Sequence, residues 1–171
     1  MASPVSSNEA YLSRLNGTFA ARLRRLIAYA ETTLGYDVTI TSGFRSYQEQ
    51  AALHAQNPSN ARPGTSRHES GIAADVNLRN RKTGQVVRKA DSLATWRATG
   101  WPAAAEKFGL HWAGSFGGYH DPVHIELLSG WEELTNSPTK KTAMWVGIIV
   151  LVIVILGVSF ALIQRYGDVK L

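Results

Sequence analysis

Two short segments hold most of the side chains that could do chemistry. In the first, SRHESGIAAD, His68 precedes Asp75 by seven residues and Gly71 lies between them. Residues 72–78 alternate apolar and polar, which predicts a strand with Asp75 on the face opposite the core. A carboxylate there suits a metal ligand or a catalytic acid, and Gly71 permits a turn that brings His68 beside it. The plain alternative is a loop histidine and a solvent-facing strand aspartate.

The second segment, YHDPVHIEL, covers residues 119–127. Its histidines His120 and His124 are four apart, but Pro122 between them disfavours a helix that would present both on one face. Read as a strand, the segment places His124 opposite the core, the same disposition as the aspartate of the first segment. Asp121 comes just before this strand and could lie near the same cleft.

Two histidines and one aspartate would fill three positions of a zinc site and leave the fourth open, as in catalytic zinc sites. A nearby carboxylate that is not a ligand can then take a proton from water. Imidazole ligands favour zinc over Mg²⁺ and Ca²⁺, which prefer oxygen. The chain has no cysteine, which excludes thiolate zinc sites, iron–sulfur clusters and a disulfide framework.

Periodicity predicts the elements that must position these residues. Apolar side chains recur at three- and four-residue spacing over residues 8–34, which indicates one long helix that ends at Gly35. Further helices are expected at 47–56, 91–99 and 102–108, and strands at 36–42, 72–78, 85–88 and 123–128. Ser46 is expected to cap the helix at 47–56, and residues 57–66 to form a loop. The fold class is therefore α+β, a small and mainly antiparallel sheet with packed helices.

The C-terminal part of the chain has a different composition. Residues 143–163 contain no charged side chain in 21 residues, and a helix of that length is about 31 Å long, close to the apolar thickness of a bilayer. A buried core helix is the alternative, but such helices rarely stay apolar on every face. We expect a folded domain at 1–128, a polar linker at 129–142, a transmembrane helix at 143–163 and a short tail at 164–171.

Because only eight residues follow the predicted span, the sequence indicates a single-pass tail anchor with the domain first on the cytoplasmic side. Gly157 and Ala161 are four apart, a spacing that permits close packing against a partner helix in the membrane. Residues 1–139 carry 14 basic and 12 acidic side chains, and the rest of the net charge of +5 flanks the span. The basic character therefore fits a membrane anchor and does not predict nucleic-acid binding.

The two segments together resemble the signature of a zinc peptidase family of D-alanyl-D-alanine carboxypeptidases and L-alanyl-D-glutamate endopeptidases, the latter including many phage endolysins. The resemblance covers residues 10–128 and implies the hedgehog/D,D-peptidase-like fold. The residues that carry it are Ser66, Arg67, His68, Gly71, Ala73, Asp75, Asp121 and His124, with Ser42–Ser46, Gln50 and Phe108–Gly114 as further matches.

The resemblance also implies a role for each matched side chain. It implies that His68, Asp75 and His124 bind Zn²⁺ and that Asp121 is the general base. Arg45 becomes the cation that holds the substrate or the developing oxyanion. The residues expected to contact the substrate are Arg45, Ser66 and Gln50.

The resemblance to this family also predicts which peptide bond is cut. The family's carboxypeptidases generally have Glu where this chain has Asp121, and the shorter Asp is similar to the endopeptidase branch. We therefore expect cleavage between L-Ala and D-Glu in the stem peptide of peptidoglycan. The alternatives are a D-alanyl-D-alanine carboxypeptidase and a non-catalytic, zinc-containing structural protein of a membrane or virion. His111 stands where phage endolysins often carry Glu, and we interpret it as a structural histidine at the edge of the cleft.

Two settings would reconcile an anchor with a substrate outside the cell. In one, a phage with a membrane in its virion uses the enzyme to digest the wall when it infects its host. In the other, the enzyme is held in the host inner membrane and acts during lysis. The first setting explains the anchor better.

Overall fold

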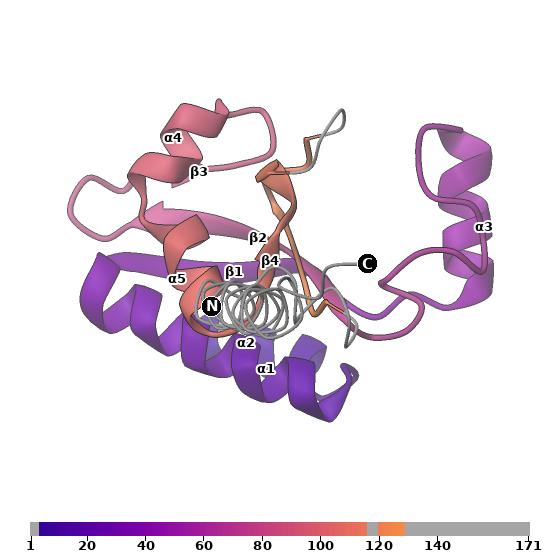
Figure 1. Cartoon of the computed structure of the whole chain (residues 1–171), viewed down its shortest axis with the longest axis horizontal. Helices are drawn as coiled ribbons and strands as arrows, with labels where there is room; N and C mark the ends of the chain where they lie inside the picture. The colour runs from indigo at the N-terminus through magenta and orange to yellow at the C-terminus, as the bar shows by residue number, and fades with distance from the viewer. Residues whose placement is uncertain (1–3, 116–119, 129–171) are drawn as a thin grey trace, which may run out of the picture. The chain divides into compact units, whose positions relative to one another are not determined.

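The computed structural model describes residues 4–115 and 120–128, which form an α+β arrangement (Figure 1). The helices are α1 (Pro4–Leu12), α2 (Gly17–Tyr29), the π-helix η1 (Ala30–Leu34), α3 (Tyr47–Gln56), α4 (Leu93–Ala98), α5 (Trp101–Lys107) and the 3₁₀ turn η2 (Ala113–Ser115). The strands are β1 (Tyr36–Ser42), β2 (Ala73–Asn80), β3 (Val86–Val87), β4 (His111–Trp112) and β5 (His124–Glu126).

The strands form one sheet in the order β1-β2-β5-β4, with β3 paired to the far end of β2. Every pairing among the described residues is antiparallel, which confirms the predicted sheet type. β2 is the longest strand and contacts three others, so it is the element against which the remaining strands are aligned.

The core lies between the sheet and the helices, and the alternation of β2 supplies part of it. Ala74, Val76 and Leu78 are fully buried, whereas Asp75 and Asn77 between them face away from the core and are partly exposed. The apolar stripe of α2 packs into the same core. The largest fully buried apolar side chains are Phe19, Leu23, Leu26, Val38, Val76, Leu78, Trp96, Trp101 and Ile125.

The prediction of one continuous helix over 8–34 is wrong. The chain leaves helical geometry after Leu12 and begins a new helix at Gly17, where the side chain of Asn16 accepts hydrogen bonds from the backbone N–H groups of Thr18 and Phe19. The apolar spacing hides the break because Leu12, Leu15 and Phe19 are buried on both sides of it. The predicted end is confirmed, since Gly35 adopts the left-handed conformation there.

Helix α3 and the loop that follows it, residues 47–66, stand apart from the other helices in Figure 1, and we call them the α3 lobe. The predicted cap is confirmed: Ser46 and Glu49 form a reciprocal capping box at the start of α3. The loop folds back on the helix through Asn60, whose side-chain amide donates to the Leu53 carbonyl and whose own carbonyl lies 2.8 Å from Nδ1 of His54.

Within residues 4–115 and 120–128, no helix has the length and apolar character needed to cross a bilayer. The predicted linker at 129–142, the predicted span at 143–163 and the tail at 164–171 lie outside the described residues.

Candidate metal centre

The register of the sheet brings two of the predicted ligands together. Asp75 of β2 and His124 of β5 are direct cross-strand partners, so their side chains leave the same face of the sheet at neighbouring positions. His68 reaches them from the turn at 66–71, where the Gly71 N–H donates to the His68 carbonyl. Gly71 has φ = +66°, a conformation that glycine adopts without strain.

This turn is docked on the break between α1 and α2. The N–H of Asn16 donates to the Gly71 carbonyl at 2.9 Å. A Cβ at Gly71 would lie 3.1 Å from that same nitrogen, so the close approach requires glycine. The turn also reaches the segment between β1 and α3, because the N–H of Arg45 donates to the carbonyl of His68.

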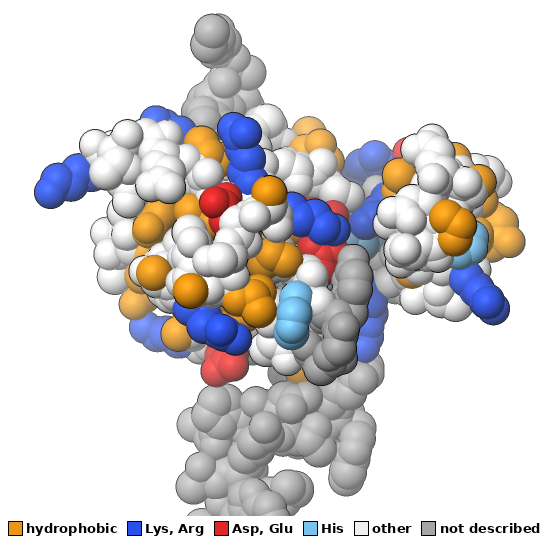
Figure 2. All heavy atoms as spheres, turned by 90° about the horizontal axis from the view of Figure 1, so that it is seen from above, with side chains coloured by type: hydrophobic (Ala, Val, Ile, Leu, Met, Phe, Trp, Pro, Cys, Tyr) orange, Lys and Arg blue, Asp and Glu red, His pale blue; other side chains and the backbone are white. Residues whose placement is uncertain are grey.

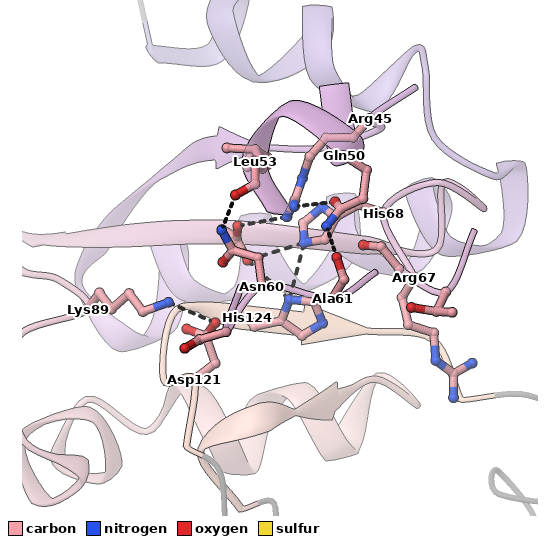
Figure 3. Close-up of a pocket in the computed structure, with 15 residues that line it drawn as sticks. Arg45, Gln50, Leu53, Asn60, Ala61, Arg67, His68, Lys89, Asp121 and His124 are labelled. Atoms are coloured by element: carbon pink, nitrogen blue, oxygen red, sulfur yellow. Dashed lines mark hydrogen bonds and ion pairs between the residues drawn. The ribbon is translucent and has the colours of Figure 1, made fainter. Parts of the chain in front are cut away.

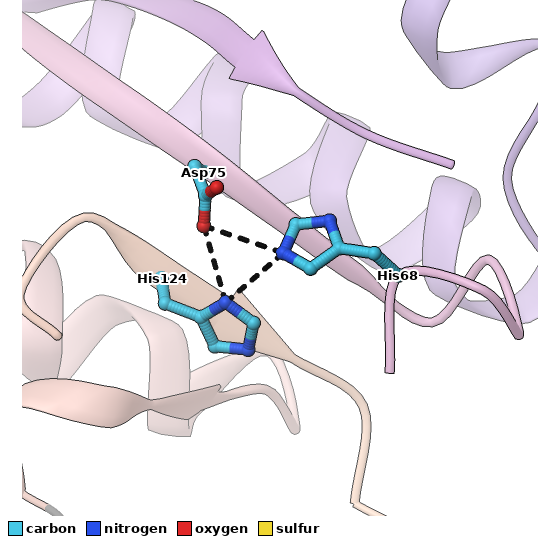
Figure 4. A group of neighbouring side chains, drawn as sticks. All are labelled: His68, Asp75 and His124. Carbon is cyan, nitrogen blue, oxygen red and sulfur yellow. Dashed lines mark hydrogen bonds and ion pairs between the residues drawn. The ribbon is translucent and has the colours of Figure 1, made fainter. Parts of the chain in front are cut away.

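Three potential ligand atoms meet at one point (Figure 4). Nε2 of His68 and Nδ1 of His124 are 3.2 Å apart, and Oδ1 of Asp75 lies 3.4 Å from the first and 3.1 Å from the second. They form a group of His and acidic side chains in the described residues whose ligand atoms are close enough to share one metal ion. The distances fit an ion bound by two imidazoles and one carboxylate.

In each histidine, the hydrogen-bond partner of the ring nitrogen that points away from this group indicates which nitrogen carries the proton. Nδ1 of His68 lies 2.7 Å from the Gly43 carbonyl, which can only accept, so Nδ1 carries the proton and Nε2 presents its lone pair. Nε2 of His124 lies 3.1 Å from the Glu126 carboxylate, so by the same reasoning Nδ1 presents the lone pair. Lone pairs that face each other and a carboxylate repel unless a positive charge lies among them, and a metal ion supplies that charge.

In the metal-free chain, a second proton on His124 can supply this positive charge in place of an ion. Burial by itself would lower the pKa of His124, but its hydrogen bonds to Asp75 and Glu126 outweigh burial and raise that pKa to about 9. Burial would raise the pKa of Asp75, yet its contacts with His124 and His68 hold that pKa well below its usual range. The site therefore attracts positive charge.

The ligand atoms line a cleft of about 470 Å³ between the sheet and the α3 lobe (Figure 3). Asp121 lies in this cleft, with Oδ2 3.0 Å from Nζ of Lys89 and Oδ1 buried without a hydrogen-bond partner among the described residues. In Figure 2, acidic, basic and histidine side chains meet where the right-hand lobe joins the rest of the described chain.

Arg45, Gln50 and Ser66 also line the cleft. Arg45 donates through Nη1 to Oε1 of Gln50 at 2.8 Å, and its Nη2 lies 3.6 Å from Oδ2 of Asp75. Gln50 is fully buried, and its Nε2 donates to the Ala61 carbonyl of the α3 lobe. Both polar ends of Gln50 are thus engaged within the chain, and its contact with a substrate stays a prediction.

The remaining histidines do not belong to this group of ligand atoms. His111 is in β4 with Nε2 3.1 Å from the Ser115 hydroxyl, and His120 is exposed. His54 ties α3 to the loop that follows it.

Sequence reasoning missed two polar residues of the site. Glu126 comes two residues after His124, and a spacing of two along a strand is the signal for a contact on one face. Lys89 lies in the segment after β3, and no pattern in the sequence pointed to it.

The chain matches known peptidases in sequence. The sequence model of the VanY family, described as D-alanyl-D-alanine carboxypeptidase, matches residues 12–117. The peptidoglycan L-alanyl-D-glutamate endopeptidase CwlK of Bacillus subtilis (strain 168) is 30% identical over 112 residues, which are 58% of this chain and 65% of CwlK. The matched region therefore spans slightly less than two thirds of that relative.

Solved structures show the same fold. The crystal structure of the Serratia marcescens L-Ala D-Glu endopeptidase ChiX aligns with a TM-score of 0.54 at 21% identity, covering 71% of this chain and 86% of ChiX. A mutant of the vancomycin resistance D,D-pentapeptidase VanY in complex with Zn(II) aligns with a TM-score of 0.51 at 16% identity, covering 67% of this chain and 73% of VanY. With the family match over most of the described residues, the chain belongs to the VanY family of D-alanyl-D-alanine carboxypeptidases and related zinc peptidases.

Proposed function

We propose that this chain is a zinc-dependent peptidoglycan hydrolase that cleaves the stem peptide between L-Ala and D-Glu. The observation that carries the proposal is the meeting of Nε2 of His68, Oδ1 of Asp75 and Nδ1 of His124 in a cleft that Asp121 and Arg45 also line. Two imidazoles and one carboxylate are a donor set that zinc accepts, and they leave room for a further ligand.

His68, Asp75 and His124 would hold the ion. When bound there, Zn²⁺ supplies Lewis acidity, which polarises a peptide carbonyl and makes water more acidic. In each histidine, an acceptor holds the N–H of the other ring nitrogen, so the nitrogen nearest Asp75 is the one left to bind the ion, and the residues fit the ion that the family uses.

Asp121 is the proposed general base. Its Oδ2 is held by the ammonium group of Lys89, while its buried Oδ1 has no hydrogen-bond partner among the described residues. A carboxylate oxygen in that situation can accept a proton and return it to the leaving amine. Lys89 fixes the carboxylate, which leaves Oδ1 as the atom that handles the proton.

Arg45 is the proposed cation for the substrate. Its guanidinium lies in the cleft beside Asp75, and the bond to Gln50 fixes the direction of its fork. A planar cation held in this way can bind a carbonyl oxygen that gains negative charge, or a substrate carboxylate. Ser66, which is buried at the cleft wall, is the second proposed substrate contact.

The choice of bond is supported by the short carboxylate at Asp121 and by the names of two relatives, CwlK and ChiX, which are both L-alanyl-D-glutamate endopeptidases. A D-alanyl-D-alanine carboxypeptidase is the second candidate, because the matching family model carries that description. The third is a zinc-containing structural protein without turnover.

Mass spectrometry of muropeptides distinguishes these functions. The full chain, purified in detergent and loaded with zinc, is incubated with muropeptides that carry complete pentapeptide stems. Release of a peptide that begins with D-Glu is the expected result. Loss of a single terminal D-Ala would instead show the carboxypeptidase, and intact muropeptides at full zinc occupancy would show the non-catalytic protein.

We also propose that residues 143–163 anchor the enzyme in a membrane, either the membrane of a phage virion or the host inner membrane. The support is the uncharged 21-residue stretch and the basic residues beside it. The full chain should stay in the membrane fraction after alkaline carbonate treatment, and Ile153→Arg, at the centre of the stretch, should release it. Recovery of the parent chain in the soluble fraction would contradict the anchor.

A further inference from the structure

Glu126 is a buried carboxylate that the proposed mechanism does not use. It is 4% exposed and lies in β5, opposite Ala73 of β2 and His111 of β4. A buried charge is costly unless neighbouring groups compensate it. The groups that surround Glu126 should therefore indicate what it does.

One neighbour is a ligand of the metal centre. Oε2 of Glu126 lies 3.1 Å from Nε2 of His124, two residues earlier on the same strand face. A carboxylate accepts the Nε2 proton, so the ring is held with its Nδ1 lone pair directed at Asp75 and His68. Without that acceptor, the Asp75 carboxylate, 3.1 Å from Nδ1, would draw the proton to Nδ1, the nitrogen that the metal ion needs.

A second neighbour is Arg67. Its Nε lies 3.7 Å from the same Oε2 atom, and Arg67 is adjacent to His68 in the chain. Glu126 thus joins the strand that carries one imidazole ligand to the turn that carries the other. The two ligands are supported differently, because His68 donates to the neutral Gly43 carbonyl and His124 to a charged carboxylate.

We propose that Glu126 is a positioning residue for the metal centre: it fixes the tautomer and orientation of His124 and strengthens that ring as a zinc ligand. A carboxylate that accepts the second N–H of a ligating histidine raises the basicity of the ring. The inference rests on the zinc site of the proposed function, and it is independent of which peptide bond is cut.

Zinc affinity tests the inference without reference to turnover. The full chain in detergent competes for Zn²⁺ with a chromogenic chelator. Glu126→Ala should weaken zinc binding by about 10- to 100-fold, the range typical of lost support for a ligand. Glu126→Gln keeps an acceptor oxygen but loses the charge, so its affinity should fall between those of the parent and Glu126→Ala.

A control variant and a variant of the ion-pair partner Arg67 complete the test. Glu106→Ala removes an exposed carboxylate on α5 and should leave zinc affinity unchanged. Arg67→Met removes the other partner of Glu126 and should change zinc affinity by less than about fivefold, because a partly exposed pair at this distance contributes little. If Arg67→Met weakened zinc binding as much as Glu126→Ala, the ion pair with Arg67 would account for the effect of Glu126, and the inference would be overturned.

The visible spectrum of the Co²⁺-loaded chain reports the ligand set directly. Glu126→Ala should shift the absorption bands of bound Co²⁺, whereas Glu106→Ala should not. Parental zinc affinity in both Glu126 variants would overturn the inference. A parent chain that binds no zinc would instead refute the proposed function itself. If Glu126→Ala does not fold, as judged by thermal unfolding with a chelator present, Glu126→Gln decides the question alone.

Discussion

The two walls of the cleft are held in place by different kinds of interaction. On the sheet wall, Asp75 and His124 are opposite each other because β2 and β5 are hydrogen-bonded in register. On the other wall, the α3 lobe meets the site through side chains, with fully buried Gln50 linking Arg45 to Ala61. Backbone pairing fixes the metal ligands, and side-chain hydrogen bonds fix the groups that face the substrate. Zinc binding and turnover should therefore be separable by mutation.

The largest effect is expected on the sheet wall. Asp75→Ala removes one of three ligands and leaves two imidazoles without their shared carboxylate, so zinc should be lost and turnover should fall below detection. Metal analysis after gel filtration measures the zinc, and muropeptide hydrolysis measures turnover. Asn77→Ala, on the same face of β2 outside the ligand group, is the matched control. A zinc-replete Asp75→Ala chain would refute the ligand assignment.

The second prediction concerns the group between the walls. Asp121→Asn keeps the shape of the side chain but cannot accept the proton, so turnover should fall by about 10²- to 10⁴-fold while zinc stays bound. Stopped assays on muropeptides give the rate, and the chelator competition gives the zinc affinity. Asp91→Asn, in the turn before α4, serves as the control carboxylate. Turnover at the parental rate would remove Asp121 as the base.

The third prediction tests the lobe wall. Gln50→Met deletes the bonds to Arg45 and to the Ala61 carbonyl at nearly constant volume, and unpaired buried polar groups cost about 1–3 kcal/mol. Because Arg45 would no longer be held in place, turnover should fall by about 10- to 100-fold, a change that corresponds to these energies. Zinc affinity should stay unchanged. Gln56→Met at the exposed end of α3 should have no effect. Equal loss of zinc and turnover would mean that the two walls are not separable.

The smallest effect concerns pH and the metal-free chain. His124 has a folded pKa of about 9 against an ordinary value of 6.5, so its contribution to stability is complete below pH 6.5 and is lost as the pH rises to 9. The lowered pKa of Asp75 acts in the opposite sense, and its contribution is lost only in acid. With a chelator present, the melting temperature should fall between pH 6.5 and 9, and His124→Gln should flatten that fall.

Zinc binding should strengthen over the same range, because the ion displaces a proton.

Much of the fold follows from local patterns in the sequence. The alternation in 36–42 and the polar cap before 47 predict β1 and α3 with the bounds that are observed. The break at Asn16 was missed because the same apolar stripe continues on both sides of it. β4 was missed because two residues, His111 and Trp112, are too few to show a period, and their pairing with β5 depends on the rest of the sheet.

The metal ligands could be predicted because their residue types and their strand faces are both visible in the sequence. Their meeting depends on the β2–β5 register, which one sequence does not contain. The role of Gln50 as a link was not visible, because its partners Arg45 and Ala61 lie on either side of a helix. Lys89 was missed because it comes from a segment without periodicity and meets Asp121 only in the folded chain.

The break between α1 and α2 has a consequence for engineering this protein. Helix propensity alone would recommend Ala at Asn16 and Gly17, which would favour one continuous rod. That rod would carry the Asn16 N–H into the helical ladder and away from the Gly71 carbonyl, which holds the turn that presents His68. Substitutions chosen at these two positions for heat resistance would therefore weaken metal binding. The break at Asn16 therefore supports the position of His68, one of the three proposed zinc ligands.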